Sequence, residues 1–136
     1  MADLIYTPFK AGLMAGNIDL SADVIKVMLT TASYVPNASD ELTGDVTNEI
    51  SSAGYSAGGV PITNQIITTN GNSGVLNGDN ITFSGITATF SGAVIYISGA
   101  TPSTSYLLGF LDLGTQTVTA GDFTITWDAN GIYNLG

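Results

Sequence analysis

The chain has 136 residues, and its eleven acidic residues are set against only two lysines and no histidine, for a formal net charge of −9 at pH 7. So little positive charge excludes direct nucleic-acid binding and disfavours docking on anionic lipid. Cysteine is absent, which excludes disulfides and thiolate metal sites. With 44% hydrophobic residues, 10% charged residues and 17 glycines, the composition is typical of one compact, turn-rich β domain over residues 1–136.

The first apolar stretch, residues 8–31, predicts a short helix and a strand rather than an export signal or a membrane helix. Asp19 and Asp23 interrupt it before the ~18–20 apolar residues that a membrane span needs, and no cluster of positive charge precedes it. Thr7 and Pro8 are typical of an N-cap and a first helical residue. Gly16 is typical of the residue after a helix end.

On this helix Phe9 and Leu13, and less regularly Met14, fall on one face. The segment before it, residues 1–7, contains Leu4, Ile5 and Tyr6 and predicts an extended N-terminal arm. Two interpretations remain open. Either Leu4, Ile5, Tyr6 and Phe9 form an interface that orders on a partner, or the arm packs on its own domain.

The rest of the chain alternates apolar runs with turn signals at spacings of about ten residues, which favours strands throughout. Residues 33–52 carry four acidic residues and predict a long loop with one helical turn capped by Asp45. Residues 70–80 predict turns around one short strand. The expected strands cover residues 24–30, 61–69, 81–83, 86–90, 92–99, 106–114, 115–119 and 123–127, with a turn at 120–122. The fold class is therefore mainly β, an antiparallel β-sandwich or barrel with a short N-terminal helix.

Two short motifs resemble catalytic signatures. Residues 54–58, Gly-Tyr-Ser-Ala-Gly, match the nucleophile elbow of hydrolases, but that serine needs a histidine base and a following helix, and Pro61 follows instead. Residues 111–115, Leu-Asp-Leu-Gly-Thr, lack the second carboxylate of an aspartic protease. We expect a glycine-rich turn and a strand end, with no catalytic residue and no enzymatic activity.

Oxygen-rich clusters raise the question of a structural calcium ion. Asn77, Asp79 and Asn80, or Asp40, Glu41 and Asp45, could offer oxygen ligands. Neither spacing matches the EF-hand calcium loop, and such clusters are ordinary turn chemistry, so we expect no metal site and no cofactor.

Threonines alternate along several of the expected strands, which places their hydroxyls on one face. Such ladders could bind ice or sugars, and Trp127 with Tyr133 could stack on a sugar ring. Threonine is also a good strand former on solvated faces, and we favour that interpretation. The threonines in question are Thr87, Thr89, Thr115, Thr117, Thr119, Thr124 and Thr126.

Several motifs resemble a group of small β-rich virion proteins of tailed bacteriophages. They are the Phe-Lys start at residue 9, Gly-Asn-Ile-Asp-Leu, Tyr-Val-Pro-Asn, Asp-Val-Thr-Asn-Glu, Gly-Tyr-Ser-Ala-Gly-Gly and the closing Asp-Phe-Thr-Ile-Thr-Trp. The resemblance runs through most of residues 9–60 and 92–134. It implies a non-enzymatic structural protein located in the virion and assembled in the host cytoplasm.

Within that group we favour a capsid decoration, or cement, protein that binds the major capsid protein and other virion proteins, as a homo-oligomer and most simply a trimer. A neck, tail or fibre-base subunit is the first alternative. A secreted module that binds sugar, ice or calcium is the second.

Overall fold

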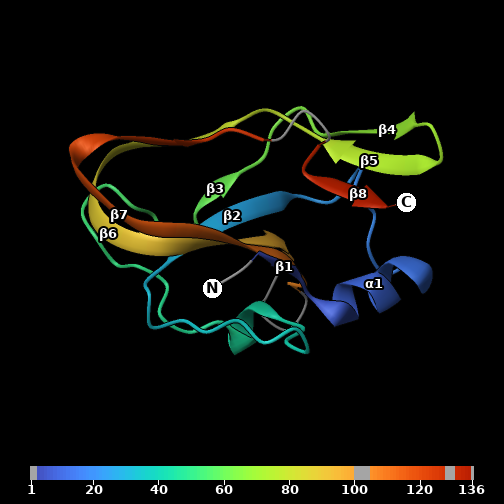
Figure 1. The fold of residues 1–136 in the computed structure, drawn as a ribbon, viewed down its shortest axis with the longest axis horizontal. Helices are drawn as coiled ribbons and strands as arrows, with labels where there is room; N and C mark the ends of the chain where they lie inside the picture. Colours follow the sequence, from blue (N-terminus) through green and yellow to red (C-terminus); the bar gives the residue numbers. More distant parts are fainter. Residues whose placement is uncertain (1–2, 100–104, 128–130, 136) are drawn as a thin grey trace.

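The computed structural model describes residues 3–99, 105–127 and 131–135 and arranges them as two antiparallel β-sheets with one short α-helix (Figure 1). The larger sheet has the strand order β1-β7-β6-β2-β3 and the smaller one β4-β5-β8. This architecture confirms the mainly β, sandwich-like class. The elements are β1 (Leu4–Ile5), α1 (Thr7–Met14), β2 (Ile25–Thr30), the 3-10 turn η1 (Thr43–Asp45), β3 (Val60–Pro61), β4 (Ile66–Asn70), β5 (Ser73–Asn77), β6 (Ile81–Ile97), β7 (Leu107–Ile125) and β8 (Tyr133–Leu135).

The helix α1 ends as its sequence predicts and begins one residue earlier than expected. Tyr6, not Thr7, is the N-cap, and its side chain makes no capping hydrogen bond. At the other end Gly16 has φ +79°, its N–H donates to the carbonyl of Leu13 at 3.2 Å, and the N–H of Asn17 donates to that of Gly12 at 3.0 Å. These two bonds are the Schellman closure that glycine permits, because a Cβ is disfavoured at positive φ.

Strands β6 and β7 replace six of the expected short strands with two long ones. Their pairing runs from Ile81 opposite Ile125 to Tyr96 opposite Leu107, with register shifts on the way. The expected turn at 120–122 is a bulge instead, and it lies opposite the break at Gly85, since Ile86 pairs with Gly121. Gly85 has φ +62° and Ala120 φ +46°. Both strands therefore bend at the same place, and bulges let them continue.

The bend folds the β6–β7 ribbon back over itself, and Figure 1 shows the two strands turning together at the left and returning above their other half. The rings of Phe90 and Phe123 meet edge to face with centroids 4.8 Å apart. Phe123 pairs with Phe83, seven residues from Phe90 and roughly 23 Å away along a straight strand. Only a folded ribbon brings these rings together, so its two halves enclose the core.

The main sheet is buried on both faces where β2, β6 and β7 meet. Along β6, Ala93, Ile95 and Ile97 join the large inner core, and the alternating Val94 and Tyr96 join a second cluster on the other face. This explains why residues 92–97 are apolar without alternation. The second cluster is closed by Tyr6, Met28, Tyr34, Leu107 and Phe110.

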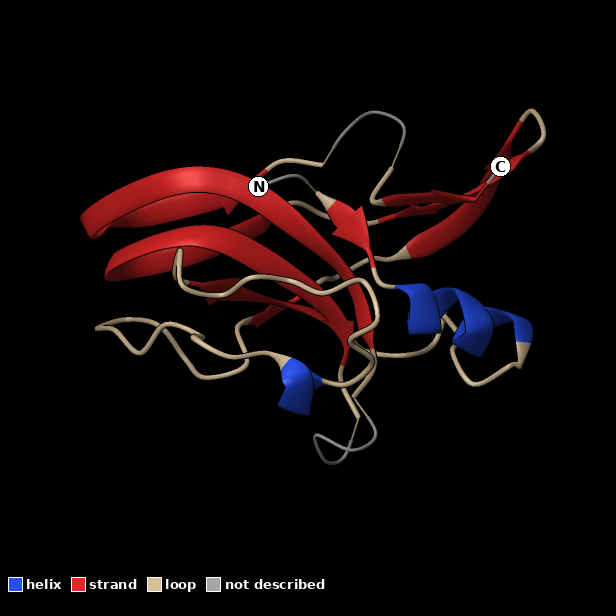
Figure 2. Ribbon diagram, turned by 60° about the horizontal axis from the view of Figure 1, so that its bottom comes forward, coloured by secondary structure: helices blue, strands red, loops and turns tan. Residues whose placement is uncertain are grey.

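The long segment between β2 and β3 covers that second cluster. Figure 2 shows this segment crossing the face of the sheet as a loop that contains a single helical turn. The hydroxyls of Tyr34 and Tyr6 are 2.6 Å apart, which ties the loop to the N-terminal segment. Asp45 lies at the end of η1, and its carboxylate accepts the N–H groups of Glu41 and Leu42 at 3.0 and 3.2 Å. The expected helical turn exists. Asp45 is its last residue rather than its first, and its side chain caps the N–H groups at the start of the turn.

The expected strand over residues 61–69 is divided between the two sheets. Val60–Pro61 pair with β2 in the larger sheet, and Ile66–Asn70 pair with β5 in the smaller one. Between them Asn64 has φ +54°, and the side-chain amide of Gln65 donates to the carbonyls of Leu20 and Asp23 at 2.9 and 2.6 Å. The chain crosses between sheets at this kink.

Gly59 allows this segment to approach β2. It has φ +80°, and a Cβ built there would lie 1.8 Å from the carbonyl oxygen of Val27. Gly59→Ala should therefore lower the free energy of unfolding by at least about 2 kcal/mol through backbone strain and the clash. Gly44→Ala is the matched control, because nothing lies within 4 Å of its Cβ position. Urea unfolding of both variants measures the difference, and equal midpoints would contradict this packing.

Candidate interaction surfaces

The N-terminal segment packs on its own chain, which agrees with the second of the two interpretations that the sequence left open. Leu4 and Ile5 pair with Phe110 and Gly109 of β7 and are half-buried. Tyr6 and Phe9 are 0% and 1% exposed. A partner cannot contact these two side chains without unfolding the segment. Residues 1–2 of the expected arm lie outside the described residues.

An open apolar groove lies between α1 and β8, and we call it the helix groove. It measures about 560 Å³ and is lined by Ile5, Lys10, Leu13, Met14, Tyr133, Asn134 and Leu135. Met14 is 85% exposed and Leu135 57% exposed. Two large apolar side chains, far apart in sequence, are thus left in water side by side, and a contiguous apolar patch of this kind marks an interaction site.

Aromatic packing holds the residues at the base of the helix groove in place. The ring of Phe9 meets that of Tyr133 edge to face, with centroids 5.2 Å apart. A smaller hollow of about 130 Å³ continues from the groove past Leu13 to Leu20 and Ile67. Of the four interface residues predicted from sequence, Ile5 lines the groove and Phe9 supports it from below, whereas Leu4 lies in a separate hollow beside β7.

Met14 and Leu135 were missed as interface residues. The helical pattern placed Met14 with the core face, but Met14 is the last residue of α1 and its side chain is 85% exposed. Its position at the end of a two-turn helix was the available signal, since such a helix has too little length to cover every apolar residue it carries. Nothing in the sequence placed Leu135 beside it.

The outer face of the β6–β7 ribbon carries the expected threonine ladder. The hydroxyls of Thr82 and Thr124 are 3.0 Å apart and those of Thr89 and Thr117 are 3.2 Å apart, each pair joining directly opposite residues. All four side chains are exposed. The ladder offers a solvated, uncharged surface, and its hydroxyls satisfy one another across the strands.

The two aromatic residues suggested for sugar stacking do not form a platform. The indole N–H of Trp127 donates to the carbonyl of Asp79 at 2.8 Å, and Trp127 packs against the inner core. Tyr133 contacts Phe9 in the helix groove. Each ring is therefore committed to packing within the chain.

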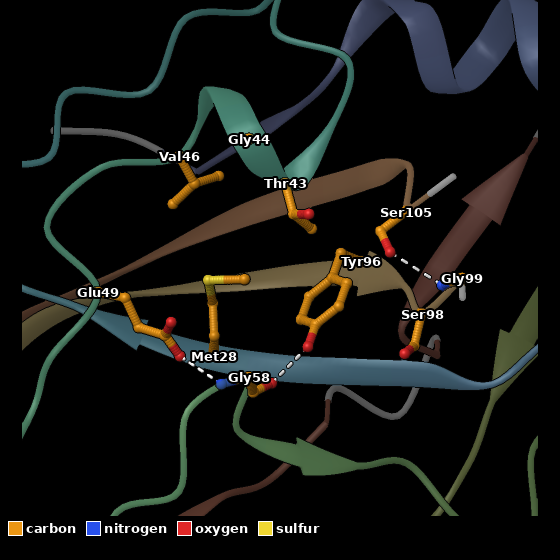
Figure 3. A pocket seen from close by; sticks show the side chains of 10 residues that line it. All are labelled: Met28, Thr43, Gly44, Val46, Glu49, Gly58, Tyr96, Ser98, Gly99 and Ser105. Atoms are coloured by element: carbon orange, nitrogen blue, oxygen red, sulfur yellow. Dashed lines mark hydrogen bonds between the residues drawn. The ribbon is translucent and has the colours of Figure 1, made fainter. Parts of the chain in front are cut away.

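Another hollow, of about 350 Å³, opens between the long loop and β6 (Figure 3). The Glu49 carboxylate accepts the hydroxyl of Tyr55 at 2.5 Å and the N–H of Gly58 at 2.7 Å, and Tyr96 donates its hydroxyl to the Gly58 carbonyl at 2.6 Å. These bonds hold the loop against the sheet. Figure 3 shows Glu49 and Tyr96 converging on Gly58, so the polar groups of this hollow are used in closing the loop.

The acidic clusters close turns. The carboxylate of Asp79 accepts from the side chains of Thr63 and Asn64 at 3.1 and 2.6 Å. In the described ranges no three His, Cys, Asp or Glu side chains gather in a way that could hold a metal ion. Nor is any helix of those ranges long and apolar enough to cross a membrane.

The two motifs that resemble catalytic signatures lie in ordinary backbone. Ser56 is exposed in a turn, and β3 follows where a nucleophile elbow would need a helix. The segment at 111–115 is part of β7. Both segments therefore have the turn and strand structure that the sequence predicts.

Comparison of the chain with protein-family models, with curated proteins and with solved structures finds no match. Any statement about its function therefore depends on the sequence resemblance and on the surfaces described above.

Buried tyrosines make stability sensitive to alkali. Burial, and then the nearby Glu49 charge, raise the pKa of Tyr96 to about 12, and burial also raises the pKa of Tyr6, Tyr34 and Tyr55. A raised folded-state pKa gives stability that is complete below the unfolded value of 10.0 and is lost as pH rises toward the folded value. Unfolding free energy should be flat from neutral pH to near 10 and then fall.

Tyr96→Phe should make this alkaline fall shallower while costing about 1 kcal/mol at neutral pH for the lost hydrogen bond. Urea unfolding across pH, with phenolate absorbance followed in parallel, measures both effects. A variant with the same alkaline slope as the parent would show that Tyr96 ionises freely in the folded chain.

Proposed function

We propose that this chain is a non-enzymatic structural protein of a tailed-bacteriophage virion, most specifically a decoration protein that binds the head shell and stabilises it. The observation that carries the proposal is the helix groove, where Met14 and Leu135 stand exposed at the end of the molecule. The sequence resemblance to small phage virion proteins supplies the class of partner.

The groove suits a protein partner. Burying an exposed Met or Leu side chain contributes roughly 1.5–3 kcal/mol to the free energy of binding. Met14 and Leu135 together can therefore anchor an interface with a partner. Lys10 lines the same groove and is one of only two cations in the chain. We infer a partner surface with an apolar ridge and a nearby carboxylate.

The rest of the surface fits a building block packed among neighbours. The exposed threonine ladder carries hydroxyls and no charge, so a neighbouring subunit can cover it without desolvating ions, which is costly. The same ladder is what favours the ligand-binding alternative for ice or sugar. A neck, tail or fibre-base position would use the helix groove equally well on a different partner.

Met14→Lys should weaken binding to purified head shells of the phage that encodes the chain by at least about tenfold, because the lysine must be desolvated in an apolar contact. The charge lies at a helix C-terminus, where it does not destabilise the free chain. Val35→Lys is the matched control, since Val35 is 71% exposed and lines none of the hollows described above. Co-sedimentation with shells stripped of the protein gives the affinities, and the shell rupture temperature gives the function.

The proposal requires the parent chain and the Val35→Lys variant to bind and to raise the rupture temperature. If the parent does not bind shells but binds isolated tails or necks, the first alternative replaces it. If it binds neither, and its melting temperature rises with a sugar, the ligand module is correct.

A further inference from the structure

The edge strands of the two sheets are protected from pairing, with one exception. β1 and β3 have two residues each and β3 ends in Pro61, while β8 has three residues. The long outer edge of β7 is broken by bulges near Gly114 and Ala120 and carries acidic side chains. Short length, proline, bulges and charge are the devices by which natural proteins prevent edge-to-edge pairing.

Strand β4, Ile66–Asn70, has none of these devices. It lies at the edge of the smaller sheet, and all five of its residues are exposed. Its pairing with β5 is regular over the whole strand, from Ile66 opposite Asn77 to Asn70 opposite Ser73. Ile66 and Ile67 point to opposite faces and remain 55% and 45% exposed. A regularly paired, uncharged and unprotected edge about 17 Å long is a template for another strand.

The charge distribution permits a second copy of this chain as the partner. No charged residue occurs between Glu49 and Asp79, although the chain as a whole carries −9. The five residues of β4 can therefore lie along a second copy of this acidic chain without like charges facing each other within the paired strands. Asp23 lies beside Gln65, just before the strand begins. Asp79 is bound to Thr63 and Asn64, beyond the start of the strand.

We propose that β4 pairs antiparallel with β4 of a second copy about a two-fold axis at Thr68, joining the two small sheets into one of six strands. Thr68 then faces its counterpart, and Ile66 lies opposite Asn70 of the second copy. Such an isologous contact uses the same five residues on both sides and closes at two chains. It covers both isoleucines in part and satisfies the outward N–H and C=O groups of the edge. This pairing does not depend on the virion proposal.

The test is the native mass of the parent chain and of three variants by light scattering at micromolar concentrations. The parent should have twice the 13.9 kDa of one chain. Thr68→Lys places two cations directly opposite each other and should weaken dimerisation at least about tenfold. Thr68→Val keeps a good strand former and should stay dimeric. Thr119→Lys makes the same change at an exposed position of β7 and should also stay dimeric.

Two further readouts make the assignment specific. Hydrogen exchange of the β4 amides should slow as protein concentration rises in the parent and not in Thr68→Lys. Added salt should strengthen the dimer, because it screens the repulsion between two acidic copies. A monomeric or trimeric parent, or a Thr68→Lys variant that dimerises as the parent does, would overturn the proposal. Circular dichroism confirms that each variant is folded.

Discussion

The fold depends on the shared bend of β6 and β7. Gly85 on one strand and Ala120 on the other adopt positive φ at facing positions, and two cross-strand hydrogen bonds hold them there. The Asp122 carboxylate accepts the Gly85 N–H at 3.0 Å, and the Ala120 N–H donates to the Thr87 hydroxyl at 2.9 Å. Because both strands bend together, one hairpin supplies both walls of the core, and the loop, the helix and the small sheet are added around it.

That construction separates the surface into parts with different chemistry. The ribbon presents its inner face to the core and its threonine ladder to water, and that ladder is polar and uncharged. The small sheet and α1 stand at the other end of the molecule, where Met14 and Leu135 frame the helix groove and β4 leaves an open edge (Figure 1). Contacts with other chains are expected at this end, because it holds the exposed apolar side chains and the unprotected backbone.

The local elements could be predicted from the sequence. The arrangements that depend on which strands pair, and in which register, could not. The helix end at Gly16, the strand ending at Thr30 and the fold class follow from capping, β-branched composition and turn spacing. The sequence predicted a break between strands at Gly85 and a turn at residues 120–122. Only the register, which places Ile86 opposite Gly121, shows that the two form one shared bend. Tyr6 and Phe9 are buried in the chain's own core, and the sequence could not decide this because aromatic residues near a terminus suit a buried anchor and an adhesive arm equally well. Met14 and Leu135 meet only through tertiary packing.

We propose that the chain works through its surface as a component of a phage particle. The most direct measurement is quantitative mass spectrometry of particles purified by density gradient, with the copy number expressed relative to the major capsid protein. A decoration protein should be a stable component of these particles, present in a fixed, high ratio to the shell subunits. Particles that retain no copies after purification, while the chain is abundant in the lysate, would contradict it.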